Sequence, residues 1–291
     1  MSRNLMRLGL AGATLAGIAW IARVFQTPEA AAFQAPKKQE TPAAAAITLE
    51  DLVSGRARTV DLTYSLNAEN AFWPGENYQP FELKTIATLE KEGVLSKAFC
   101  LPEHLGTHLD APNHFENNQP SVEKLTAAEL FGPGVVIDIA ALAEQNADYT
   151  LTLQDVERWE KEHGRIPEGA IVLLDTGWGR FWNNIARFQN RDARGQLHFP
   201  SYSADAARFL IETRKARGLG IDNLSIDPGN SKDFPVHHIV NKAGKFGLEN
   251  VANLGQLPPR GFYLIVAPIK IETGTGGPCR IWAILPEKTA N

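Results

Sequence analysis

The sequence predicts one α/β domain between about residues 48 and 288. Apolar segments of strand length alternate with segments that carry helix caps, and no internal repeat is visible. The 291-residue chain is 44% hydrophobic and 21% charged. This balance is ordinary for a globular protein that buries a core without needing disulfides or metals to hold it together.

Each expected element has a local signal. A short helix over residues 48–55 precedes a strand over 58–66. Residues 81–101 predict two strands around a turn at Glu92 and Gly93. The remaining strands are expected at 134–139, 170–177, 219–227, 245–251, 261–271 and 279–285. Helices are expected at 126–131, 152–164, 203–218 and 234–244, and two of them have clear caps: Thr152 with Gly164, and Ser203 with Gly218.

The N-terminus has the layout of a secretory signal. Two arginines lie within the first seven residues, residues 8–22 are apolar and uncharged, and small residues follow. We therefore expect residues 1–26 to be a signal peptide, or an anchor if they are not cleaved. Residues 27–47, rich in Ala and Pro, are expected to be a disordered linker. The domain is then expected to be periplasmic or secreted, with a membrane association only through an uncleaved segment.

Charge and cysteine content limit the partners. The net charge is −4 and the basic residues are scattered, which argues against a nucleic-acid partner. Cys100 and Cys279 could pair in an exported protein, but two buried free thiols are the simpler expectation.

Residues 104–115, HLGTHLDAPNHF, hold three of the seven histidines of the chain. Imidazole and carboxylate are the usual ligands of zinc and manganese, and catalytic sites use about three of them. His104, His108 and Asp110 could form such a set, and His114 could act as a general acid or base. A histidine pair alone is more often a surface accident, but the additional Asp, Gly and Pro favour a metal site.

This run resembles the signature H-x-G-T-H-x-D-x-P-x-H-F of the bacterial kynurenine formamidase family, also called the cyclase family. Two further segments resemble that family: FWPG at residues 72–75, and residues 234–250, in which His237 and Glu249 are twelve positions apart. The resemblance covers roughly residues 58–286.

The resemblance implies a swivelling β/β/α domain around a small mixed β-barrel, as a homodimer or tetramer. It implies two metal ions, usually zinc and in some members manganese. His104, His108 and Asp110 would hold one ion, and Asp110, His237 and Glu249 the other. His114 would be the catalytic acid/base, and Trp73 would contact a small-molecule substrate.

The expected reaction is hydrolysis of an amide, lactam or ester carbonyl by a metal-activated water. The closest named activity is arylformamidase, which converts N-formylkynurenine to kynurenine and formate. Alternatives are a lactam hydrolase similar to isatin hydrolase, a metal-dependent cyclase or dehydratase, and a catalytically silent binding protein. Because tryptophan catabolism runs in the cytoplasm, the predicted export signal argues against N-formylkynurenine as the substrate.

Several neighbouring residues have two interpretations. His238 is expected to face solvent, because adjacent helical residues point about 100° apart. His163 and His198 are expected to be surface histidines. The aromatic segment 175–198 either caps a pocket or packs, with packing favoured. Asp175 either faces the pocket or caps a turn.

Overall fold

The computed structural model describes residues 47–287, which lie in one compact unit of the chain. The expected signal or anchor segment, 1–26, and nearly all of the expected linker, 27–47, lie outside the described residues. Within the described part, no helix has the length and apolar character needed to span a bilayer.

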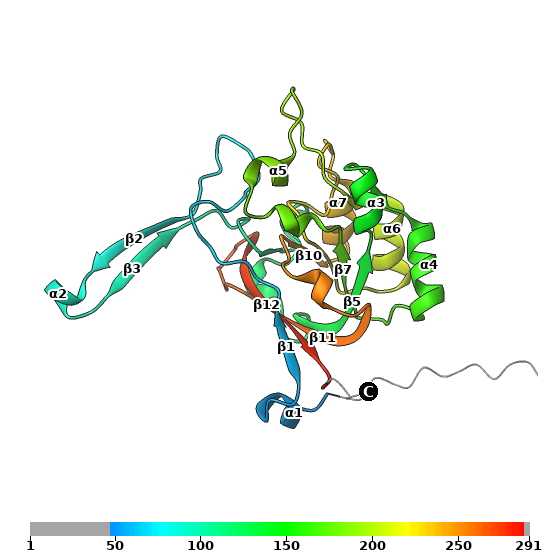
Figure 1. Ribbon diagram of the computed structural model, residues 1–291, viewed down its shortest axis with the longest axis horizontal. Coiled ribbons are helices and arrows are strands. Elements are labelled where there is room, and N and C mark those ends of the chain that lie inside the picture. Colours follow the sequence, from blue (N-terminus) through cyan, green and yellow to red (C-terminus); the bar gives the residue numbers. More distant parts are fainter. Residues whose placement is uncertain (1–46, 288–291) are drawn as a thin grey trace, which may run out of the picture. The chain divides into compact units, whose positions relative to one another are not determined.

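Seven strands close into a mixed barrel (Figure 1). The sheet order is β1-β12-β11-β5-β7-β9-β10-β4, and β4 also pairs with β12, so the sheet closes on itself while β1 continues it beyond β12. The strands of this sheet are β1 (Arg58–Asp61), β4 (His108–Asp110), β5 (Phe131–Asp138), β7 (Ile171–Asp175), β9 (Gly218–Ile221), β10 (Phe246–Glu249), β11 (Arg260–Pro268) and β12 (Gly276–Leu285). β5, β7, β9 and β10 run parallel, and the other pairings are antiparallel. The predicted α/β class with a small mixed barrel is confirmed.

Some of the helices cover the parallel side of the barrel, whereas α1 lies next to β1 and α2 lies at the tip of a hairpin (Figure 1). The helices are α1 (Leu49–Val53), α2 (Leu89–Glu92), α3 (Ala140–Gln145), α4 (Leu153–His163), α5 (Ile185–Gln189), α6 (Ala204–Arg208) and α7 (Pro235–Lys242). Apolar residues of α4, α6 and α7 pack with those of β5, β7 and β9 in one buried cluster. The predicted caps of α4 are confirmed, since Thr152 forms a capping box with Asp155 and the helix ends before Gly164. A short parallel pair, β6 (Thr150–Leu151) with β8 (Ser201–Tyr202), lies outside the barrel.

Two predicted helices were wrong in part. Residues 126–131 form only one turn, because Phe131 already belongs to β5. The predicted helix over 203–218 begins at its expected cap, Ser203, but ends in a π-turn at Thr213. Gly218 is the first residue of β9, where a Cβ atom would lie 2.5 Å from the ring of Phe246. This glycine therefore allows close strand packing and does not end a helix.

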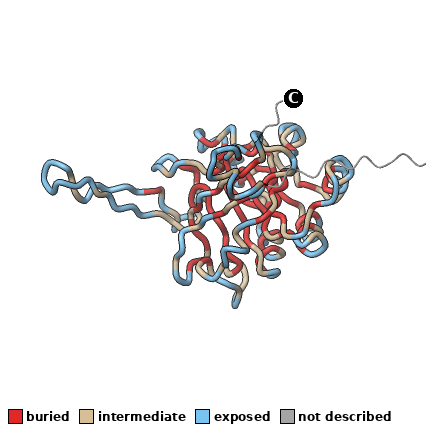
Figure 2. Tube along the Cα trace, turned by 90° about the horizontal axis from the view of Figure 1, so that it is seen from below, coloured by how far each residue is buried: buried red, intermediate tan, exposed pale blue. Residues whose placement is uncertain are grey.

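The two strands predicted within residues 81–101 are confirmed as a hairpin, β2 (Glu82–Ala87) and β3 (Ser96–Cys100). The left-handed Gly93 (φ 69°) ends α2 in the connection between them. The hairpin projects away from the barrel (Figures 1 and 2), and most of its residues are exposed. Cys100, on β3, is exposed and Cys279 is buried. Both are free, as expected, but the expected burial was wrong for Cys100, because β3 lies on the projecting hairpin.

Candidate metal centre and pocket

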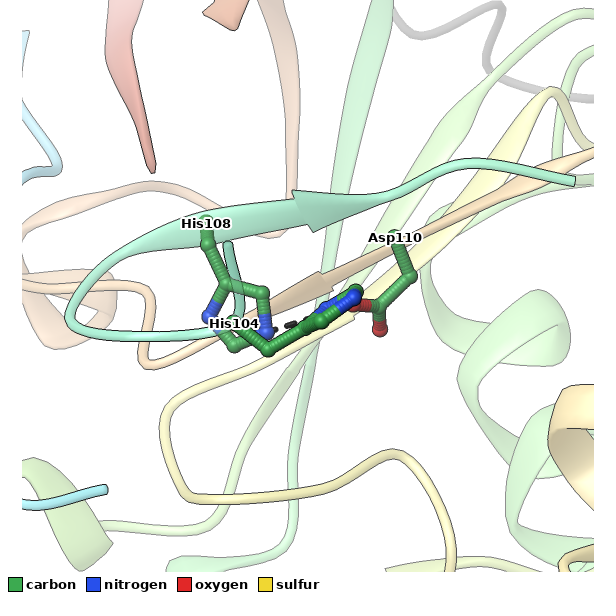
Figure 3. A group of neighbouring side chains, drawn as sticks. All are labelled: His104, His108 and Asp110. Carbon is green, nitrogen blue, oxygen red and sulfur yellow. Dashed lines mark hydrogen bonds and ion pairs between the residues drawn. The ribbon is translucent and has the colours of Figure 1, made fainter. Parts of the chain in front are cut away.

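Barrel closure brings the two predicted halves of the site together. His108 and Asp110 lie on β4, and β4 pairs with β10 on one side and β12 on the other. In this register His108 lies opposite Glu249, the last residue of β10. His104 comes from the loop before β4 (Figure 3), and His237 from the first turn of α7.

These five side chains form two overlapping sets of candidate ligands. The donor atoms of His104, His108 and Asp110 lie within 4.8 Å of one another, and so do those of Asp110, His237 and Glu249. Asp110 Oδ1 lies 2.6 Å from His104 Nδ1 and 3.2 Å from His108 Nε2, whereas its Oδ2 lies 3.4 Å from His237 Nε2. One oxygen of Asp110 therefore faces each set, which is the arrangement that a bridging carboxylate needs.

Two glycines leave room beside the central carboxylate. Gly247 of β10 and Gly276 of β12 both lie opposite Asp110. A Cβ atom on Gly247 would lie 3.0 Å from Asp110 Oδ2, and one on Gly276 would lie 2.6 Å from His104 Cε1. Larger residues at these strand positions would displace the candidate ligands.

Each candidate histidine ligand is oriented through its second ring nitrogen. His108 Nδ1 lies 2.9 Å from the Gly106 carbonyl, to which it can only donate. Its Nε2 is therefore the free nitrogen, and it points toward Asp110 and Glu249, the latter at 3.4 Å. Such outer partners fix the tautomer and the ring orientation of a metal-binding histidine.

Asp227 plays the same role for His237. Its Oδ2 accepts from His237 Nδ1 at 2.7 Å and from the His237 backbone N–H at 2.9 Å, and its Oδ1 accepts from the Val236 N–H at 2.9 Å. The Asp227 carboxylate thus binds the N-terminus of α7 and leaves His237 Nε2 facing Glu249 Oε1 at 3.3 Å.

Glu103 and Thr275 support His104. The Thr275 hydroxyl donates to Glu103 at 2.6 Å, so it accepts a hydrogen bond from His104 Nε2 at 3.0 Å. This leaves His104 Nδ1 as the nitrogen that faces Asp110.

The electrostatics of the centre favour cations. Burial raises the pKa of Asp110, but His108 and the neighbouring imidazoles outweigh burial and hold this pKa well below its usual value. Burial lowers the pKa of His108, yet the Asp110 and Glu249 carboxylates outweigh it and raise this pKa to about 10. The pKa of His237 is also raised well above its usual value, because Asp110, Asp227 and Glu249 outweigh its burial. The two buried carboxylates of the centre therefore draw positive charge to this point.

The residues present fit a divalent metal. His108 Nε2 and Asp110 Oδ2 are buried and have no hydrogen-bond partner among the described residues, which is costly unless another group satisfies them. Three imidazoles and two carboxylates are a donor set suited to zinc or manganese.

A cavity of about 200 Å³ opens above this centre. His114 lines it and stacks on His104, with ring centroids 3.9 Å apart. Burial lowers the pKa of His114 to about 3, so this imidazole is neutral near pH 7. The predicted acid/base is therefore next to a candidate ligand and open to a bound molecule.

Aromatic side chains form much of the cavity wall. Trp73 lines it as predicted and packs edge-on against Phe234, with centroids 5.8 Å apart. Tyr78 and Phe115 also line the cavity, and the ring of Phe115 packs against that of His237, with centroids 4.3 Å apart. The walls therefore suit a small flat molecule.

Several residues of the site were not found from the sequence. Asp227, Glu103 and Thr275 orient the candidate ligands, but each acts on a partner brought near by folding: Asp227 on His237, Glu103 on Thr275, and Thr275 on His104. Tyr78 follows the segment 72–75, Phe115 ends the segment 104–115, and Phe234 begins the segment 234–250. An aromatic residue in or next to these segments was the signal in the sequence that could have indicated a cavity wall.

The other predicted neighbours lie away from the cavity. Trp178 and Trp182 are buried in an aromatic cluster that Trp73 packs against, and neither of them lines the cavity, so the packing interpretation of this segment is confirmed. Asp175 caps a turn by accepting from the Gly177 N–H at 3.0 Å. His238 is exposed as expected, and it pairs with Glu116 at 2.9 Å.

The two remaining histidines differ from each other. His163 is half-buried beside Trp159, with ring centroids 5.0 Å apart. His198 is partly exposed and pairs with Asp148 at 2.8 Å, a contact that raises its pKa. The sequence could not show this pairing, since the two residues are fifty positions apart.

Known proteins resemble this chain along most of its length. The family model Cyclase matches residues 60–228. Isatin hydrolase from Roseibium aggregatum is 32% identical over 251 residues, covering 81% of this chain and 95% of that protein. Kynurenine formamidase from Bacillus thuringiensis subsp. konkukian is 29% identical over 222 residues, covering 76% of this chain and 94% of that protein. The solved structure of isatin hydrolase A from Labrenzia aggregata, bound to benzyl benzoate, is 37% identical with a TM-score of 0.77, covering 82% of this chain and 97% of that one.

Proposed function

Because this chain belongs to the cyclase family of metal-dependent hydrolases, we propose that it hydrolyses the C–N bond of a small aromatic lactam or aryl amide. The observation that carries this proposal is the position of His114. A neutral, half-buried imidazole lies beside five candidate metal ligands at the inner wall of an aromatic cavity.

The chain's residues divide the chemistry among them. A metal held by His104, His108, Asp110, His237 and Glu249 would supply activation of water and polarisation of the carbonyl oxygen. His114, being neutral, can accept a proton from the attacking water and return it to the leaving nitrogen. Four of these candidate ligands are buried and His104 is half-buried, and this low exposure to water strengthens the charge interactions in the site.

The cavity supports a small planar substrate. Trp73, Tyr78, Phe115 and Phe234 present aromatic surfaces around about 200 Å³, which suits stacking or edge contacts with a ring of one or two cycles. We place a lactam such as isatin first and N-formylkynurenine second, since the identity and the coverage are higher for isatin hydrolase than for kynurenine formamidase.

The test is a substrate panel with the purified chain loaded with zinc or with manganese. Isatin, N-formylkynurenine, simple aryl formamides and small lactones are assayed for ring opening or release of formate. We expect turnover of at least one amide or lactam, a loss of about 10²–10⁴-fold in His114→Ala, and wild-type turnover in the control His163→Ala. Hydrolysis of none of these compounds, or equal activity of the two variants, would contradict the proposal.

A silent binding protein is the second candidate, and metal analysis separates it. The intact set of candidate ligands favours an enzyme. Less than one equivalent of zinc or manganese after reconstitution would favour the binding protein.

The N-terminal sequence supports a further part of the proposal, that the enzyme acts outside the cytoplasm. The basic start and the apolar segment 8–22 are the features that support it. A fusion of residues 1–46 to a reporter that is active only after export tests this, and an inactive reporter would contradict it.

A further inference from the structure

Two polar side chains on the cavity wall have no role in the chemistry proposed above. Ser225 and Asn250 line the cavity together with candidate ligands and His114. Each is 2% exposed, and neither belongs to the two sets of candidate ligands. Buried polar groups are normally hydrogen-bonded, so the atoms that these two side chains leave free indicate what the cavity can bind.

Asn250 leaves one acceptor free. Its Nδ2 donates to the Gly106 carbonyl at 3.0 Å, and because a carbonyl only accepts, this contact fixes which way the side-chain amide is turned. Its backbone N–H donates to the Asn223 carbonyl at 2.9 Å, and its backbone carbonyl accepts from the Thr107 hydroxyl at 2.7 Å. Asn250 Oδ1 is the remaining polar atom, and within residues 47–287 it has no partner. A buried acceptor of this kind is costly until a donor reaches it.

Ser225 leaves one donor free. Its N–H donates to Asn223 Oδ1, and its Oγ accepts from the Asp227 N–H, both at 3.1 Å. In the described part of the chain, no group accepts the hydrogen of the Ser225 hydroxyl. This O–H is therefore available to donate to a molecule in the cavity.

The fold holds the free donor and the free acceptor on neighbouring loops. Ser225 follows β9 and Asn250 follows β10, and these two strands are parallel neighbours, so their carboxyl ends meet at one edge of the sheet. Asn223, which is fully buried, joins the loops, because its carbonyl binds the Asn250 N–H and its side chain binds the Ser225 N–H. The pair is thus ordered before a ligand arrives, which favours binding.

We propose that Ser225 and Asn250 bind the amide edge of the substrate, with the Ser225 hydroxyl donating to the amide oxygen and Asn250 Oδ1 accepting the amide N–H. A lactam ring holds its C=O and N–H on the same edge, so a lactam can make both contacts. An open-chain secondary amide is trans and points the two groups in opposite directions, so it can make only one. The two residues would therefore determine specificity for lactams within the proposed function, on which this inference rests.

The charge of the cavity wall agrees with such a ligand. Among the described residues, those that line the cavity include no Lys and no Arg. An uncharged lactam needs no such partner, whereas a substrate with a carboxylate on its side chain would lack one there.

Binding of simple amides to the full-length, zinc-loaded chain tests the proposal. Calorimetry compares 2-oxindole, which is a lactam, with N-methyl-2-oxindole, which lacks the N–H, and with acetanilide, whose amide is trans; chromatography checks that each ligand stays intact. We expect 2-oxindole to bind about tenfold more tightly than either of the others. Equal affinities for 2-oxindole and its N-methyl derivative, or no binding of 2-oxindole, would overturn the proposal.

Two variants assign the contacts to their residues. Ser225→Ala should bind 2-oxindole about tenfold more weakly, and Asn250→Gly, in which glycine tolerates the φ of 54° at this position, should bind 2-oxindole and its N-methyl derivative within about twofold of each other. Metal analysis accompanies both, since a purely structural role would lower the zinc content. The control Ser54→Ala removes an exposed hydroxyl at the end of α1 and should bind all three ligands as the wild type does. Wild-type affinity for 2-oxindole in Ser225→Ala, or an undiminished preference for it in zinc-loaded Asn250→Gly, would contradict the assignment.

This test and the test of the proposed function can fail separately. A chain that prefers 2-oxindole in the expected way but hydrolyses no amide or lactam supports the Ser225–Asn250 pair and contradicts the proposed function. A chain that hydrolyses amides but binds the three ligands equally contradicts the pair alone. If Asn250→Gly loses its zinc, the comparison of 2-oxindole with its N-methyl derivative in the wild type still decides whether the N–H is bound.

Discussion

Replacing Asp227 with asparagine should weaken metal binding although Asp227 is not a candidate ligand. The wild-type carboxylate accepts the His237 Nδ1–H at 2.7 Å. The side-chain amide of the Asp227→Asn variant has one oxygen in place of two. When that oxygen accepts from the Val236 N–H at the Oδ1 position, the NH₂ group lies at the Oδ2 position and faces His237 Nδ1 and the His237 N–H, which lie 2.7 and 2.9 Å from Oδ2 in the wild type. Two donors cannot face each other, so the imidazole would move its proton to Nε2 and lose the lone pair that faces Asp110 and Glu249.

The size of the expected loss of metal affinity can be estimated. Removing an outer partner of a ligand histidine costs about 10- to 100-fold in metal affinity, which is about 1.4–2.8 kcal/mol. The N-terminus of α7 also loses one charged acceptor, for about 1 kcal/mol of folding stability. Competition titration of the metal-free protein against a fluorescent chelator measures the affinity, and thermal unfolding without metal measures the folding part.

The same loop offers a matched control. Asp233 is exposed and lies close before α7, so Asp233→Asn removes one charge without touching His237. The reasoning fails if Asp227→Asn binds metal within about twofold of the wild type, or if Asp233→Asn loses as much affinity.

The other predictions concern the centre and one distant ion pair. His114→Ala should keep its metal and lose turnover, whereas Asp110→Ala should lose all of its metal, since both ligand sets use this carboxylate; metal analysis of the two variants distinguishes the roles. Gly276→Ala should lower metal affinity, because its Cβ would lie 2.6 Å from His104 Cε1 and 2.4 Å from the Leu109 carbonyl, whereas Gly255→Ala, whose Cβ meets Asp175 at an ordinary 3.6 Å, should not. Asp148 raises the pKa of His198, so this pair stabilises the fold fully below the unfolded pKa of 6.5 and loses that effect as the pH rises through the higher folded pKa. His198→Gln should therefore lower the melting temperature at about pH 5.5 and change it little at about pH 9; an equal change at both pH values would show that the pair does not contribute through its charge.

The sequence was sufficient for the first half of the candidate metal centre. His104, His108 and Asp110 lie within seven positions, so a short loop and one strand place them together. His237 and Glu249 are far from this run, and only the resemblance to a family connected them with it. The structure brings all five together, because β4 pairs with β10.

The residues that orient the candidate histidine ligands could not be predicted from the sequence, for a physical reason. Asp227 is the last residue of the strand predicted over 219–227, and its partner is ten residues further on. Nothing in local spacing distinguishes a carboxylate that orients a histidine from one that faces solvent. The same limit applies to Thr275, which supports a histidine 171 positions away.

The fold was predictable where local signals agreed with packing. Thr152 and Gly164 mark α4 at both ends, because capping is decided by neighbours in sequence. Gly218 misled for the opposite reason. A glycine after a helical pattern favours a C-cap, but here the ring of Phe246, on the adjacent strand, requires the missing side chain.

Closure of the barrel and assembly of the candidate centre depend on the same strand, β4. β4 has only three residues, yet it pairs on both sides, and two of those residues are candidate ligands. A strand so short is held weakly by its ladder hydrogen bonds alone. The pairing of β4 with β10 places two carboxylates, Asp110 of β4 and Glu249 of β10, among three imidazoles in a buried site, an arrangement that costs free energy until a cation balances it. The residues that make closure unfavourable in the absence of a cation are therefore those that would make it favourable with one, since a metal would join β4 to β10, to α7 and to the His104 loop.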